Sequence, residues 1–203
     1  MKNSILILFI TTSIASPSFG AAFNLDFVFT GGTIPASTFG GDAGQVGIWS
    51  TETAGGTGNM TDILGVVTST TFNGGGFTEF VGGGDPLYED LFRDRDAFGQ
   101  VWQFEILNLD PGEYNFWLYA GPSGSGEFSV ESDGVTTNYS SISALSSSPI
   151  PVTVTAGNRV FFLSGSSAGD EGVAALQIVP VPEPTTALLG FVALPLALRR
   201  RRR

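Results

Sequence analysis

The side chains on which most enzymes rely for nucleophilic or zinc-assisted chemistry are missing from this sequence. It contains no histidine and no cysteine, which removes the usual serine and cysteine machinery and most zinc sites. Carboxylates remain as the groups that could act as acid and base or hold a cation. We therefore expect a non-catalytic protein without a resident cofactor.

One carboxylate pattern points toward glycan cleavage. Glu131-Ser132-Asp133 begins the Glu-x-Asp-x-x-Glu strand of glycan-cleaving jelly rolls, in which paired carboxylates attack the glycosidic bond. Gly134-Val135-Thr136 ends the pattern without its second glutamate. A glycan-cleaving enzyme is kept as the third functional alternative.

A second carboxylate pattern concerns calcium. The run Asp94 to Gly99, with Glu105 at the twelfth place, matches much of an EF-hand loop. Phe98 stands where an oxygen ligand is required, and Glu105 belongs to a predicted strand instead of a helix. We therefore predict no metal-ligating residues, and a structural calcium ion held elsewhere in an acidic loop stays open without named ligands.

Aromatic side chains offer a third kind of chemistry. Trp117 and Tyr119 share one face of a predicted strand, about 6.6 Å apart by strand rise, and aromatic faces can pack on sugar rings. If that face is exposed, these two residues form the site of a carbohydrate-binding module, which is the second alternative. If the strand is central, loops cover the face.

The charge of the chain limits its partners. All nineteen acidic residues lie between Asp26 and Glu183, where only Arg93, Arg95 and Arg159 are basic, so three minus nineteen gives this part a formal charge of −16 against −10 overall. Such a surface repels phosphate backbones, so we expect no nucleic-acid partner. Without cysteine there is no disulfide framework.

Short strands must position these side chains, because period-two alternation dominates from Phe23 to Pro180. The turn Leu109 to Glu113, with Pro111 and Gly112, predicts a hairpin between the strands Trp102–Ile106 and Tyr114–Tyr119 on either side of it. Alternation places Phe104 and Ile106 on one face of the first strand, and Phe116 and Leu118 on the face of the second strand opposite Trp117 and Tyr119. Asp85 to Phe92 is the one place where a helical turn is expected. We predict an all-β fold, a single β-sandwich or jelly roll. Further strands are expected at Phe23–Phe29, Glu127–Glu131, Pro151–Thr155, Val160–Ser164 and Val173–Val179.

The first 22 residues have the order of an export signal. Lys2 gives a positive start, an apolar run from Ile5 to Ile14 follows, and small residues lead to Ala22. The apolar block of about ten residues is too short to span a bilayer. We expect a signal helix over residues 1–22 that a signal peptidase removes.

The last 23 residues, 181–203, have three parts in order. They are the motif Pro182, Glu183 and Pro184, an apolar segment from Thr185 to Leu198, and a basic block of Arg199, Arg200, Arg201, Arg202 and Arg203. As a helix the apolar segment would be about 21 Å long, shorter than a hydrocarbon core of about 30 Å. The arginines would act as a stop-transfer signal on the cytoplasmic side. We predict a short C-terminal transmembrane helix suited to transient insertion in the inner membrane.

This three-part tail closely resembles the PEP-CTERM sorting domain of bacteria that make extracellular polysaccharide. The resemblance implies an exosortase-type membrane protease as a partner, cleavage near the Pro-Glu-Pro motif, and transfer of the protein to the cell surface or outside. It implies an exported, non-catalytic surface or matrix protein associated with extracellular polysaccharide.

The body, residues 23–180, resembles a galactose-binding-like β-sandwich that recurs in such proteins. Gly47-Ile48-Trp49-Ser50, the Leu109 to Tyr119 segment and the closing strand Ala175 to Val179 carry this likeness. Ser50 stands where an asparagine is expected. The resemblance implies a fold and no particular ligand.

Overall fold

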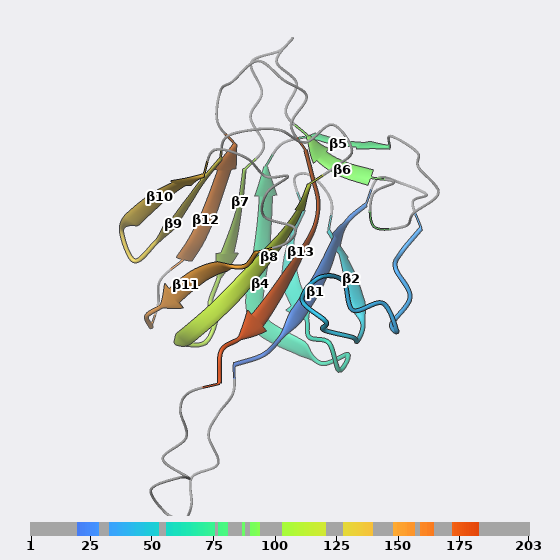
Figure 1. The fold of residues 1–203 in the computed structure, drawn as a ribbon, viewed down its shortest axis with the longest axis horizontal. Helices are drawn as coiled ribbons and strands as arrows, with labels where there is room; N and C mark the ends of the chain where they lie inside the picture. Colours follow the sequence, from blue (N-terminus) through green and yellow to red (C-terminus); the bar gives the residue numbers. More distant parts are fainter. Residues whose placement is uncertain are drawn as a thin grey trace, which may run out of the picture. The chain divides into compact units, whose positions relative to one another are not determined.

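Regular structure in the described part of the chain consists of strands alone. The computed structural model describes residues 20–28, 33–52, 56–75, 77–80, 87, 90–93, 103–120, 128–139, 148–156, 159–164 and 172–182. In these residues the strands form two sheets (Figure 1), so the prediction of an all-β fold is confirmed there. The predicted signal helix and C-terminal transmembrane helix lie outside the described residues.

The first sheet has seven strands, and β13 has partners on both sides. The main order is β11, β8, β13, β1 and β2, while β6 pairs with both β13 and β5. β1 and β2 are parallel, and the other pairs are antiparallel. The strands are β1 (Phe23–Phe27), β2 (Trp49–Glu52), β5 (Phe77–Phe80), β6 (Asp90–Arg93), β8 (Gly112–Ala120), β11 (Ile150–Val154) and β13 (Gly172–Pro180).

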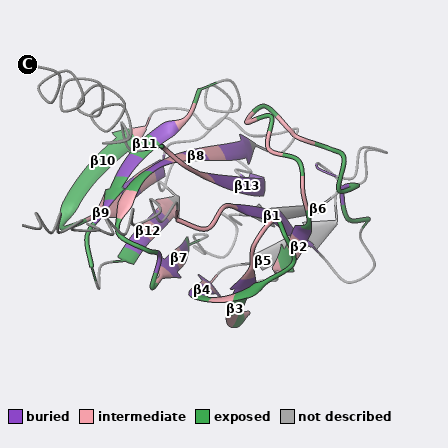
Figure 2. Ribbon diagram, turned by 90° about the horizontal axis from the view of Figure 1, so that it is seen from below, coloured by how far each residue is buried: buried purple, intermediate pink, exposed green. Residues whose placement is uncertain are grey.

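The second sheet has six strands, all paired antiparallel in the order β10, β9, β12, β7, β4 and β3. Its edge strands, β10 and β3, each contain two threonines and one asparagine. Figure 2 shows β10 as an exposed strand. The strands are β3 (Thr57–Thr61), β4 (Val67–Gly75), β7 (Gln103–Leu107), β9 (Phe128–Ser132), β10 (Val135–Tyr139) and β12 (Arg159–Ser164).

One hydrophobic core joins the two sheets. Phe27 of the first sheet packs on Phe72 and Phe104 of the second, with ring centroids 5.7 and 5.4 Å apart. Phe162 stacks on Phe104 at 4.5 Å and contacts Phe116 across the core at 5.6 Å. The inward faces of both sheets therefore bury one aromatic layer, as in a β-sandwich.

The predicted hairpin around Pro111 is wrong. β7 pairs with β4 and β12 in the second sheet, whereas β8 pairs with β11 and β13 in the first. The connection therefore crosses from one sheet to the other. The Tyr114 hydroxyl donates to the Asp110 carbonyl at 2.8 Å and fixes this corner. The apolar stripes of β7 and β8 face each other across the core instead of lying side by side.

The helical turn expected over Asp85 to Phe92 is also wrong where it can be compared. Asp90, Leu91 and Phe92 belong to β6, which pairs with β5 and with the start of β13. Hydrogen bonds to β5 and β13 satisfy backbone amides and carbonyls of this segment that a helical turn would otherwise pair internally. Of residues 85–89, the structure describes only Leu87, which lies in a turn.

Candidate functional site

The two ends of the described chain leave the same end of the first sheet. β1 and β13 are antiparallel, with Phe23 opposite Ile178 (Figure 1). The Val181 amide donates to the Glu113 carbonyl at 2.8 Å. Pro182, the next residue, is exposed. The first residue of the predicted sorting motif therefore follows directly after a residue that is hydrogen-bonded to the sheet.

The strand before the motif is firmly held. Residues Gly172 to Ile178 of β13 are buried, and exposure begins to rise at Val179. Glu183, Pro184 and the five arginines Arg199, Arg200, Arg201, Arg202 and Arg203 lie outside the described residues. The motif thus starts at a boundary between buried strand and exposed chain.

The aromatic face of β8 is covered. Trp117 and Tyr119 do share the face opposite the core residues Phe116 and Leu118, as predicted. Tyr119, however, is only 1 % exposed and belongs to a small buried cluster. Trp117 is partly buried and packs against this cluster. Of the two alternatives left open for this face, the structure shows the covered one at Tyr119, whose ring has no face open to a ligand.

A polar network attaches the covering segment to the sheet. The Gln177 amide nitrogen lies within hydrogen-bond distance of Asn24 Oδ1 (2.9 Å) and of the Gly40 and Gln45 carbonyls (both 3.1 Å). The Tyr119 hydroxyl donates to Gln177 Oε1 and accepts from the Asp42 amide at 2.7 Å. These buried groups satisfy one another, so the segment around Gly40 to Gln45 is part of the fold.

The described acidic residues of the glycan-cleavage and calcium patterns interact with other side chains. Glu105 and Glu131 both lie 3.6 Å from Arg159, on neighbouring strands of the second sheet. Asp133 accepts from the Thr155 hydroxyl at 3.0 Å. Asp94 to Gly99 lie outside the described residues. Within the described ranges, no group of three or more acidic side chains could hold a metal ion.

Burial raises the pKa of three described side chains, Glu52, Tyr114 and Tyr139. Burial raises the pKa of Glu52 to about 7. Burial, and secondarily the negative charge of Asp110, raises the pKa of Tyr114 to about 12. Among the described residues, none of the three belongs to a group of acidic side chains that could hold a metal ion.

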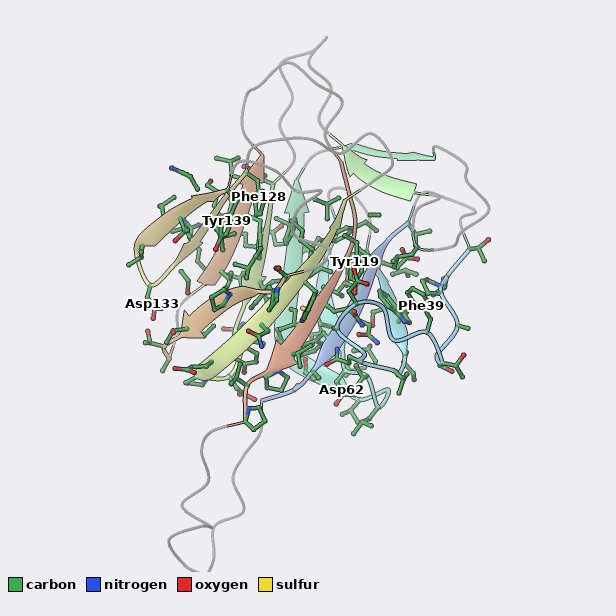
Figure 3. All side chains as sticks on the ribbon, viewed as in Figure 1. Phe39, Asp62, Tyr119, Phe128, Asp133 and Tyr139 are labelled. Carbon is green, nitrogen blue, oxygen red and sulfur yellow. The ribbon has the colours of Figure 1, made fainter. Side chains whose placement is uncertain are left out.

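A groove of about 350 Å³ is lined by residues of β9 and β10 in the second sheet and of β11 in the first. Its lining includes Val135, Tyr139, Ile150 and Val152, and the Tyr139 ring is stacked on Phe128 at 5.0 Å (Figure 3). No basic side chain lines it. Phosphate and carboxylate ligands are therefore poorly matched to this groove.

Comparison with known proteins adds no relative: no family model, no curated protein and no solved structure matches this chain. None of the described segments is a helix long and apolar enough to cross a membrane.

Proposed function

We propose that this chain is an exported, non-catalytic protein of the bacterial cell surface or extracellular matrix, sorted through its Pro-Glu-Pro tail. Residues 1–22 direct export and are removed by a signal peptidase. Residues 181–203 insert transiently in the inner membrane through a short helix, and an exosortase-type protease cleaves near Pro182 to Pro184. The mature domain, a β-sandwich of the galactose-binding-like kind, then resides with extracellular polysaccharide.

The proposal depends on the order of the three parts of the tail, which are the motif, the apolar segment and the arginine block. It depends equally on the place where the tail leaves the sheet. Pro182 is exposed one residue after the Val181 amide is bonded to Glu113. A protease needs an extended, accessible backbone, and the two prolines favour such a conformation. The buried β13 strand supports the proposal because it keeps the folded domain intact on the N-terminal side of the cut.

The non-catalytic part of the proposal is supported by the residue types and their contacts. Histidine and cysteine are absent from the chain. Glu105, Glu131 and Asp133 are each paired with a side chain other than a carboxylate. The proposed function therefore includes neither sugar stacking on Tyr119 nor glycan cleavage.

Substitution of the motif tests the sorting step. In the native host, Pro182→Ala combined with Pro184→Ala should leave the protein in the inner membrane with its arginine block attached. Pro111→Ala, in an exposed turn, is the matched control and should be processed normally. The sorting proposal fails if the double variant reaches the surface with the same mass as the native protein.

A further inference from the structure

Five large aliphatic side chains are exposed close together on one end of the domain. All five belong to two segments, residues 46–48 and 62–67, which are joined by a backbone hydrogen bond, and the set is called the aliphatic turn patch. Their exposed fractions run from 43 % to 80 %. The members are Val46, Ile48, Leu64, Val66 and Val67.

The connection between β3 and β4 presents the patch in a fixed conformation. Asp62 Oδ1 accepts from the amides of Leu64 at 2.9 Å and Val66 at 2.8 Å. The Asp62 amide also donates to the Val66 carbonyl at 2.9 Å. The exposure of Leu64, at 80 %, is therefore imposed by the turn and does not reflect a loose loop.

The second segment of the patch is attached to this turn. The Ile48 amide donates to the Ile63 carbonyl at 3.0 Å. A Cβ at Gly65 would lie 2.9 Å from Ile48 Cδ1, so Ile48 packs directly against the turn. The two segments that carry the patch are therefore in direct contact through Ile48.

The patch lies at the end of the domain where the chain ends emerge. The Ile63 amide donates to the Ala22 carbonyl at 3.0 Å, and Phe23, the residue after Ala22, pairs with Ile178. Figure 3 shows Asp62 in the lower part of the view, toward the end of the domain where β1 begins and β13 finishes in Figure 1. The turn is therefore hydrogen-bonded to the residue before β1, at the end of the first sheet where β13 also finishes.

The sequence places an apolar segment within short reach of this end. Thr185, where that segment begins, is three residues after Pro182, and three residues span about 10 Å at most. If the tail enters the bilayer as proposed above, the end of the domain that carries the patch must lie at the membrane surface. We propose that the aliphatic turn patch inserts into the lipid interface while the tail is embedded, and so holds the domain against the membrane for processing.

The patch suits lipid better than another protein strand. The Leu64, Gly65 and Val66 amides are all taken by Asp62, so the turn offers few free donors to an incoming backbone. The side chains are aliphatic, without the aromatic and arginine anchors typical of protein interfaces. Exposed Leu and Val on a turn can bury shallowly at the boundary of headgroups and acyl chains. This inference rests on the proposed function, since the tail brings the patch to the bilayer.

Single labels can locate the patch because the chain has no cysteine of its own. The full chain, reconstituted in phosphatidylcholine vesicles, would carry an environment-sensitive fluorophore at Val67→Cys, Val135→Cys or Ala193→Cys. Val67 and Val135 are matched, being 65 % and 66 % exposed, but they lie on β4 and on the far edge strand β10. Nitroxide-bearing lipids should quench the Val67→Cys label about twofold more than the Val135→Cys label.

The Ala193→Cys label separates the two proposals. If it is quenched while the Val67→Cys label stays in water, tail insertion stands and patch insertion is wrong. If it is not quenched, membrane insertion of the tail fails and the patch proposal falls with it. Equal quenching of the Val67→Cys and Val135→Cys labels also overturns insertion of the patch. So does a fluorescence change of the Val67→Cys label that appears on raising the protein concentration alone.

A second variant measures how much the patch contributes. Leu64→Ser combined with Val67→Ser changes only exposed side chains, so the fold should be kept. The vesicle affinity of this variant should fall about tenfold or more, since two aliphatic side chains no longer leave water. An unchanged affinity would contradict the proposal.

Discussion

Phe23 and Ile178 lie opposite each other in an antiparallel pair, although they stand near opposite ends of the folded domain's sequence. Because of this pairing, the predicted signal peptide and the predicted sorting tail attach at the same end of one sheet. The pairing also buries β13 before the tail begins.

Gly41→Ala should destabilise the domain by about 2–3 kcal/mol. Gly41 has a φ of +56°, and a Cβ there would lie 2.3 Å from the Tyr119 hydroxyl and 2.6 Å from Gln177 Oε1. Gly44→Ala is the control, since Gly44 has a φ of +66° with no atom near its Cβ, and it should cost about 1 kcal/mol. Urea unfolding checks both, and equal losses would contradict the packing described here.

Tyr119→Phe should cost about 1–3 kcal/mol, because it leaves the buried Gln177 Oε1 and the Asp42 amide without this hydroxyl. Amide hydrogen exchange should speed up at Asp42. It should not change at Gly65, whose amide donates to the Asp62 carbonyl at 3.0 Å. If exchange at Asp42 is unaltered, Tyr119 does not hold the covering segment.

Glu52 should make the domain less stable as the pH rises. Burial raises its pKa from 4.5 to about 7, so the folded protein retains a proton that the unfolded chain releases in this interval. Its contribution is complete below pH 4.5 and is lost as the pH passes about 7. Glu52→Gln should therefore match the native protein at pH 4 and exceed its urea midpoint at pH 8.

A Glu52→Gln difference that is the same at pH 4 and pH 8 would show that Glu52 does not titrate in this range.

Alternation predicted the strands that bury one face. Phe104 and Ile106, and Phe116 and Leu118, lie in the core as the spacing requires. Strands of low apolar content were not predicted, because β10 is exposed or half-buried throughout and β3 buries only Met60. These residues form strands because they pair with an adjacent strand of the sheet, and not because one of their faces is buried.

Two further features could not be predicted from residues that are close together in the sequence. The residues around Pro111 predict a tight turn, but turn chemistry does not say whether the next strand joins the same sheet. The hydrogen bond from Gln177 to Asn24 joins residues 153 positions apart. No local pattern signals such a contact, so the cover over Tyr119 was one of two open alternatives.

The most direct test of the sorting account is mass spectrometry of the protein recovered from the surface of its native host. The account predicts a chain that ends near Pro182 to Pro184 and lacks Arg199 to Arg203. Mature molecules that still carry Arg203 and remain in the inner membrane would contradict it.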